Sequence, residues 1–205
     1  ATTVHELFKH YGICEDYLGA DEETKQDLLT REIKNIRPLF PTQVDKFDPI
    51  TQRIVNMWRM VGEAHEQYGS VVIDTSIASM SKQASDVLTM LLFASEVGVA
   101  DSLHIVPLFE TIADLKHAPD VMRTLFNNPV YREHMEKSSD ERGLHQQIMI
   151  GYSDSSKDGG YLASNWNLYQ AQDKLTTTCA DEGILLELFL HAPTEVIINR
   201  KKSPQ

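Results

Sequence analysis

Apolar residues along the first third of the chain recur at every third or fourth position, which is typical of helices. The pattern predicts a helical segment over residues 1–68, with helices near 21–36 and 48–69. Asp21 and Asp48 directly precede these two patterns, where an aspartate can cap a helix by accepting backbone N–H groups. We therefore expect this part of the chain to be helical.

Beyond residue 69 the pattern changes to short apolar runs that are separated by helical segments. The runs have the length of strands and do not alternate strictly, which is typical of strands covered on both faces. They are SVVIDTSIAS (70–79), LHIVPLFE (103–110), IMIGYSDS (148–155) and ILLELFL (184–190). Helices are predicted between them near 84–98, near 119–129 with Pro119 at the helix start, and near 161–175.

Successive runs begin 33 to 45 residues apart, a spacing that suits β-α repeats. The predicted fold class is therefore α/β, with a parallel sheet and right-handed crossovers. A doubly wound open sheet and part of a β/α barrel both fit, and both bind ligands at the carboxyl ends of their strands. On this pattern, residues 69–190 form the β/α part and residues 191–205 form a tail.

The 205 residues carry a net charge of −11, which disfavours binding to nucleic acids or anionic membranes. No apolar stretch reaches the length of a membrane span, and the N-terminal residues lack the layout of a signal peptide. Cys14 and Cys179 lie far apart, as expected for two free thiols of a cytoplasmic protein. We expect a cytoplasmic protein without nucleic-acid or membrane partners.

Polar chemistry follows the second and third apolar runs. Glu110 comes directly after the second run, and Asp154 ends the third, with Lys157 three residues later. Carboxylates at the ends of neighbouring parallel strands converge on one edge of the sheet, where their oxygens suit Mg²⁺ or Mn²⁺. Lys157 adds positive charge for an anion, and the backbone at Gly159 and Gly160 is open to one at the start of a helix.

Structural roles offer an alternative for the same residues. Glu110 or Asp154 could cap the following helix, and Lys157 could lie on the surface. Asp114, one helical turn beyond Glu110, is a further acidic candidate for which a solvated or structural role is favoured. The glycine patterns of a Walker A loop and of a Rossmann dinucleotide site are both absent from the sequence.

Two other groups of residues favour structural roles. Ser79, Ser81 and Ser85 form a hydroxyl cluster, but no histidine stands at a spacing diagnostic of a serine nucleophile. Trp58 and Trp166 share helical spacing with other apolar residues, so we expect both indole rings to pack in the core.

Several longer motifs resemble one known family. GYSDSSKDGG (151–160) is similar to the GYSDS-x-KDAG signature of phosphoenolpyruvate carboxylases. SMSKQASDVL (79–88) and VPLFETIADLKHAP (106–119) resemble two further segments of that family, and the ordered match runs from about Leu28 to Phe189. One departure is Gly159, which stands where the family usually has alanine.

The resemblance implies part of a (β/α)8 barrel with additional packed helices. It implies the reaction of phosphoenolpyruvate with bicarbonate to give oxaloacetate and phosphate, with Mg²⁺ or Mn²⁺ as cofactor. By motif position the family's metal ligands fall on Glu110 and Asp154, and its lysine for bicarbonate falls on Lys157. A cytoplasmic tetramer is implied for the parent enzyme.

The sequence also departs from the family at its ends. It contains neither the TAHPTE-type segment with the family's catalytic histidine nor the LDIRQ-type segment with a substrate arginine. After Phe189 the family's HGRGG run is replaced, and we assign no role to His191. We therefore expect the 205 residues alone to be inactive. A non-catalytic scaffold, or another phosphoenolpyruvate-using metal-dependent barrel, stays open as an alternative.

Overall fold

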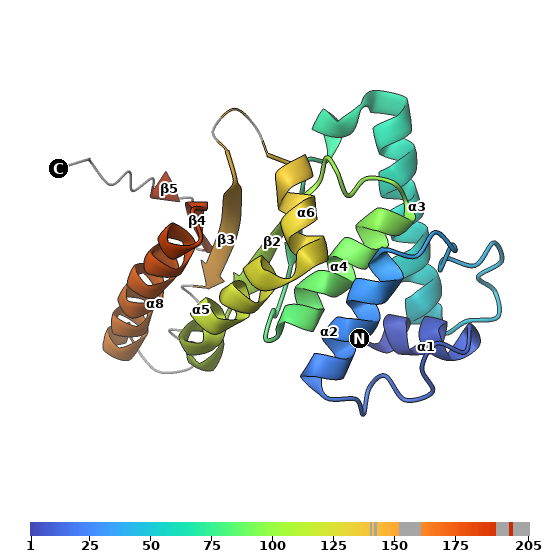
Figure 1. Cartoon of the computed structure of the whole chain (residues 1–205), viewed down its shortest axis with the longest axis horizontal. Helices are drawn as coiled ribbons and strands as arrows, with labels where there is room; N and C mark the ends of the chain where they lie inside the picture. Colours follow the sequence, from blue (N-terminus) through green and yellow to red (C-terminus); the bar gives the residue numbers. More distant parts are fainter. Residues whose placement is uncertain (140, 142, 152–160, 192–196, 199–205) are drawn as a thin grey trace.

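The computed structural model describes residues 1–139, 141, 143–151, 161–191 and 197–198, which form a sheet packed against helices (Figure 1). Asp154, Lys157, Gly159 and Gly160 lie outside the described residues. None of the described helices combines the length and the apolar character needed to cross a bilayer.

The sheet has four parallel strands that pair in chain order, as the β-α spacing predicts. A short fifth strand pairs antiparallel with the fourth. The strands are β1 (Thr75–Ala78), β2 (His104–Phe109), β3 (His145–Gly151), β4 (Leu185–His191) and β5 (Ile197–Ile198). The first apolar run is only partly a strand, because Ser70–Val72 form a 3₁₀ turn, η1, ahead of β1.

Helices α1 (Thr2–His10), α2 (Glu22–Ile33) and α3 (Pro49–Tyr68) precede the sheet. The helices between the strands are α4 (Ala84–Glu96), α5 (Ile112–Asn127), α6 (Pro129–Lys137) and α8 (Tyr161–Asp181). Because α5 contacts both α4 and α8, these three helices form a row along the sheet (Figure 1). Helix α1 lies within the predicted helical segment 1–68, whereas α6 lies outside the helix ranges that apolar spacing predicts.

Short-range capping explains where several helices begin. The Asp21 carboxylate accepts the N–H of Thr24, and the Asp48 carboxylate accepts the N–H of Ile50, as predicted for both caps. The prediction that a helix begins at Pro119 is wrong, because α5 already begins at Ile112 and Pro119 lies inside it. The earlier start has a stronger signal, a reciprocal capping box, than the proline that suggested the later one.

The core confirms one tryptophan prediction and contradicts the other. Trp58 is buried, whereas Trp166 is 60% exposed and stacks on the exposed ring of Tyr169. Helix α8 instead buries Leu168 and Leu175, which lie on another face of the helix. Both faces of α8 carry apolar residues. The face that packs against α5 is the one that is buried.

Pro107 interrupts the ladder between β2 and β3, because proline has no N–H to donate. The Gln146 side-chain amide lies in the gap, where it donates to the carbonyls of Ile105 (3.1 Å) and Gln147 (2.7 Å). The hydroxyl of Tyr131 in turn donates to Gln146 Oε1 at 2.8 Å. A buried side chain therefore replaces part of the missing backbone pairing and joins α6 to the sheet.

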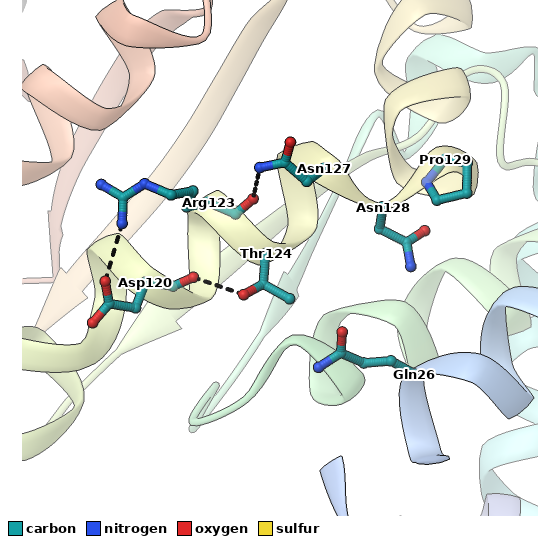
Figure 2. A pocket seen from close by; sticks show the side chains of 7 residues that line it. All are labelled: Gln26, Asp120, Arg123, Thr124, Asn127, Asn128 and Pro129. Atoms are coloured by element: carbon teal, nitrogen blue, oxygen red, sulfur yellow. Dashed lines mark hydrogen bonds and ion pairs between the residues drawn. The ribbon is translucent and has the colours of Figure 1, made fainter. Parts of the chain in front are cut away.

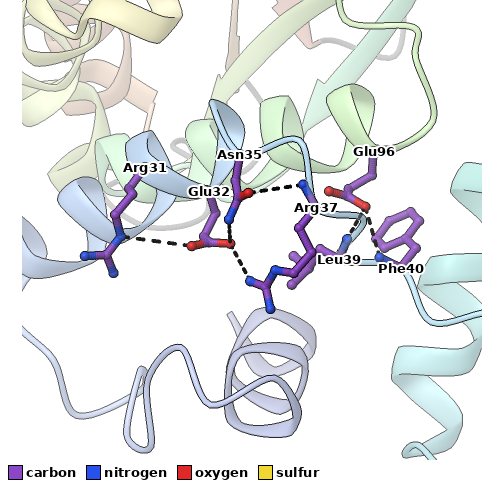
Figure 3. A network of polar contacts seen from close by, with 7 residues as sticks. All are labelled: Arg31, Glu32, Asn35, Arg37, Leu39, Phe40 and Glu96. Atoms are coloured by element: carbon purple, nitrogen blue, oxygen red, sulfur yellow. Dashed lines mark hydrogen bonds and ion pairs between the residues drawn. The ribbon is translucent and has the colours of Figure 1, made fainter.

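Two glutamates fasten the link between α2 and α3 (Figure 3). Glu96 Oε2 at the end of α4 accepts the N–H groups of Leu39 (2.6 Å) and Phe40 (2.9 Å). The buried Glu32 carboxylate accepts from Arg37 Nη2 at 2.9 Å. Burial raises the pKa of Glu96, and the two N–H donors only partly offset that effect.

His134 in α6 makes the stability of the fold depend on pH. The ring is buried, and Nδ1 lies 2.8 Å from the carbonyl oxygen of Ala100. Burial lowers the pKa of His134 to about 4. Since the unfolded chain has a histidine pKa near 6.5, it binds more protons than the folded chain between these values. The contribution of His134 is therefore complete above about pH 6.5 and is lost as the pH falls toward 4.

Replacing His134 should flatten this pH dependence. We expect His134→Gln to remove about 3 kcal/mol of the loss in unfolding free energy between pH 6.5 and pH 4, because glutamine does not titrate. Urea unfolding at several pH values in that window would measure the slope. The matched control is His117→Gln on α5, where the histidine is exposed. Equal slopes for His134→Gln and the unmodified chain would contradict the assignment.

Candidate functional site

Glu110 lies where predicted, directly after β2 at the carboxyl edge of the sheet. Its side chain is half-buried, and Oε2 accepts the backbone N–H of Met80 at 2.8 Å. Met80 belongs to the turn that follows β1, so the ends of two neighbouring strands meet at this carboxylate. The register of the sheet thus holds Glu110 at the edge where parallel α/β sheets bind ligands.

Gly151 ends β3 beside Glu110, because the preceding residues Phe109 and Ile150 are paired in the sheet. A Cβ atom at Gly151 would lie 3.0 Å from Glu110 Cα and 3.3 Å from its carbonyl oxygen. Only glycine permits this approach without a shift of backbone. Gly151, the last residue of β3, therefore lies next to Glu110, and Asp154 lies outside the described residues.

The helix-cap alternative for Glu110 is wrong. The N-cap of α5 is Thr111, whose side chain accepts the N–H of Asp114 at 3.1 Å, while Asp114 Oδ2 accepts the N–H of Thr111 at 3.1 Å. Asp114 is buried in this capping box, which confirms its structural role. With the cap made by its neighbours, Glu110 is not needed to start the helix.

The serine cluster next to β1 also has structural partners. Ser81 is fully buried, and its hydroxyl donates to the carbonyl of Ala78 at 2.7 Å. The Ser85 hydroxyl donates to Glu22 Oε2 at 2.7 Å, which links α4 to α2. These bonds support the structural interpretation of the cluster over a nucleophile.

The oxygen chemistry of Glu110 fits Mg²⁺ or Mn²⁺. A carboxylate offers about four acceptor positions, and the N–H of Met80 uses one of them. Mg²⁺ commonly takes only one or two protein carboxylates and completes its shell with water and substrate phosphate. Within the described part of the chain, no three histidine, cysteine or acidic side chains are grouped to hold a metal.

A separate pocket of about 540 Å³ lies between α2 and the junction of α5 with α6 (Figure 2). Its polar side chains already have partners within the fold. Arg123 pairs with Asp120 at 3.1 Å, Asn127 donates to the Arg123 carbonyl at 2.8 Å, and Asn128 donates to Thr30 at 2.8 Å. Sequence reasoning did not single out these residues, and their bonds indicate structural roles.

Two features of the site lack a recognised signal in the sequence. Met80 has a φ of 53°, and it is the one non-glycine residue with positive φ among those that the structure describes. Nothing in the sequence around Met80 signals that conformation. Gly151 is visible as a glycine, but only the register of β2 and β3 shows that its missing Cβ matters.

Comparison with known proteins gives one consistent result. The family model described as Phosphoenolpyruvate carboxylase matches residues 1–191. The phosphoenolpyruvate carboxylase of Roseiflexus castenholzii is 41% identical over 189 residues, which cover 90% of this chain and 20% of that protein. That of Gloeobacter violaceus is 38% identical over 179 residues, covering 84% of this chain and 18% of that protein. The chain thus spans about a fifth of the length of these relatives.

Adding a side chain at Gly151 should disturb the edge of the sheet. We expect Gly151→Ala to lower the unfolding free energy by about 1–3 kcal/mol, because the new methyl group overlaps the Glu110 backbone. Urea unfolding measures this loss. The control is Glu110→Ala, which removes the half-buried carboxylate without crowding the backbone and should cost less than about 1 kcal/mol. A fully stable Gly151→Ala would show that the two strands can move apart freely.

Proposed function

The chain belongs to the phosphoenolpyruvate carboxylase family, and we propose that it is a central part of an enzyme that carboxylates phosphoenolpyruvate with bicarbonate. The products are oxaloacetate and phosphate. The observation that carries the proposal is the position of Glu110 and Gly151, side by side at the carboxyl edge of the sheet, within motifs that match the family. We propose the cytoplasm as the compartment and a homo-tetramer as the parent enzyme.

We infer that β1 to β4 belong to a (β/α)8 barrel with additional packed helices. The strands pair in chain order without the reversal that a doubly wound sheet has, which supports this choice. By register, the face opposite the helix row carries an apolar row of Leu108, Met149 and Phe189. In a barrel such residues fill the interior. Ile77, on the same face of the neighbouring strand β1, is 43% exposed in the chain alone.

Glu110 and Asp154 would hold the Mg²⁺ or Mn²⁺ ion. Asp154 follows Gly151 by three residues, a separation that covalent geometry limits to about 11 Å. Because Gly151 ends its strand beside Glu110, this limit supports the proposal that both carboxylates bind one ion. When bound, the ion would offset negative charge on the phosphate and on the developing enolate.

The remaining chemistry assigns roles to charge and to exclusion of water. Lys157 would hold bicarbonate by its positive charge as bicarbonate attacks the phosphoryl group. The backbone N–H groups near Gly159 and Gly160 would bind anionic oxygens at the start of the helix. The attack gives carboxyphosphate and the enolate. Carboxyphosphate then splits into CO₂ and phosphate, and the enolate attacks CO₂ to give oxaloacetate, while exclusion of water keeps the enolate from taking a proton instead. Because the chain as a whole has a net charge of −11, binding of these anions requires a positively charged group close to the site.

Metal binding tests the site directly. We expect Mn²⁺ affinity, measured by electron paramagnetic resonance on the 205-residue chain, to fall at least about tenfold in Glu110→Gln and in Asp154→Asn. A direct ligand should matter at least as much as the hydrogen-bond partners of ligands, which contribute about 10–100-fold. Asp120→Asn is the matched control, because Asp120 is an exposed carboxylate on α5. Equal affinities in all three variants would refute the metal site.

The chain by itself should not complete the reaction. We expect no bicarbonate-dependent oxaloacetate when it is mixed with phosphoenolpyruvate, bicarbonate and Mg²⁺, because the segments with the family's catalytic histidine and substrate arginine are not among its 205 residues. A coupled malate dehydrogenase assay measures oxaloacetate, with a full-length relative as positive control. Formation of oxaloacetate by the chain alone would contradict this prediction. Metal binding without turnover would also be expected of a non-catalytic scaffold, the alternative function.

A further inference from the structure

We propose that Met80 is a positioning residue, whose backbone N–H orients the Glu110 carboxylate toward the cation. The inference rests on the proposed metal site, since it concerns how this chain aims one of that site's ligands. Met80 lies in the turn Ser79–Met80–Ser81, between the end of β1 and the start of α4.

The conformation of Met80 is costly and needs an explanation. Its φ of 53° lies in the left-handed region, which residues other than glycine, asparagine and aspartate seldom adopt. The side chain is 60% exposed, so packing of the thioether in the core does not account for the conformation. What the conformation achieves is the 2.8 Å hydrogen bond from Met80 N to Glu110 Oε2. Backbone strain of this kind persists where the surrounding structure holds it.

Two hydrogen bonds from Ser81 hold the turn in place. Its backbone N–H donates to the carbonyl of Leu108 at 3.0 Å, and its hydroxyl donates to the carbonyl of Ala78 at 2.7 Å. The first bond extends the pairing of β1 with β2 beyond the end of β1. Because Leu108 stands two residues before Glu110, the donor and the carboxylate are fixed to the same strand.

The consequence is a carboxylate with one oxygen held by a rigid donor. A glutamate has three rotatable side-chain bonds, and a fixed hydrogen bond at Oε2 removes much of that freedom before any cation binds. Groups that hydrogen-bond to metal ligands typically change metal affinity by about 10–100-fold. Gly151 limits the Glu110 backbone from the β3 side, so the turn and the glycine together determine where the carboxylate points.

A matched pair of substitutions separates conformation from side-chain identity. Met80→Val disfavours a positive φ, because a β-branched residue is strained there, whereas Met80→Asn tolerates it. On the 205-residue chain, we expect Met80→Val to weaken Mn²⁺ binding by about tenfold and Met80→Asn to leave it unchanged. Amide hydrogen exchange at position 80 gives a readout without metal, and exchange should be faster in Met80→Val and in Glu110→Ala. Exchange of the Ser81 amide in Glu110→Ala is the internal reference and should not change.

The outcomes distinguish this inference from the proposed function. If the unmodified chain binds no Mn²⁺ through Glu110, the metal site is refuted and the positioning role falls with it. If the unmodified chain binds Mn²⁺ and Met80→Val binds it equally well, the metal site stands and the positioning role is refuted. Equal weakening in Met80→Val and Met80→Asn would also overturn it, because the methionine side chain rather than the turn would then matter. Weakening confined to Met80→Val, with faster exchange of the amide at position 80, supports the proposal.

Discussion

The parallel pairing of β1 to β4 in chain order is the constraint on which the site depends. It places the carboxyl ends of neighbouring strands at one edge, so that residues 29 to 41 positions apart in the sequence become neighbours. Glu110 receives a backbone donor from the turn after β1 and backbone contact from the end of β3. Neither contact would survive a shift of register by one residue, because that shift turns every side chain to the opposite face.

The same sheet contains a proline, Pro107, that cannot donate a backbone hydrogen bond. Pro107 lies in a strand that is paired on both sides, where a missing N–H would leave a carbonyl without its donor. The amide of Gln146 replaces that donor, and Tyr131 holds the amide in place. Buried polar groups are therefore satisfied near the site by side chains from α6 and β3, which ties the order of the sheet to the packing of its helices.

Local signals in the sequence predicted much of the framework. Aspartate caps at Asp21 and Asp48 are short-range interactions, so the residues on either side suffice to predict them. The buried parallel strands follow from continuous apolar runs. Predictions failed where several local signals competed. Pro119 predicts a helix start, but the capping box upstream begins α5 earlier, and the spacing of Trp166 predicts a core position, but α8 buries a different face.

The sequence by itself determined the helices and strands of most of the chain, the edge of the sheet that carries Glu110 and the family to which the chain belongs. These follow from periodicity, caps and motifs, which act over a few residues or are matched directly. Only the tertiary structure decided that a side chain at Gly151 would crowd the Glu110 backbone and that Met80 adopts a left-handed conformation. Both depend on distances between strands that are remote in sequence, and such distances are set by register and packing rather than by neighbouring residues.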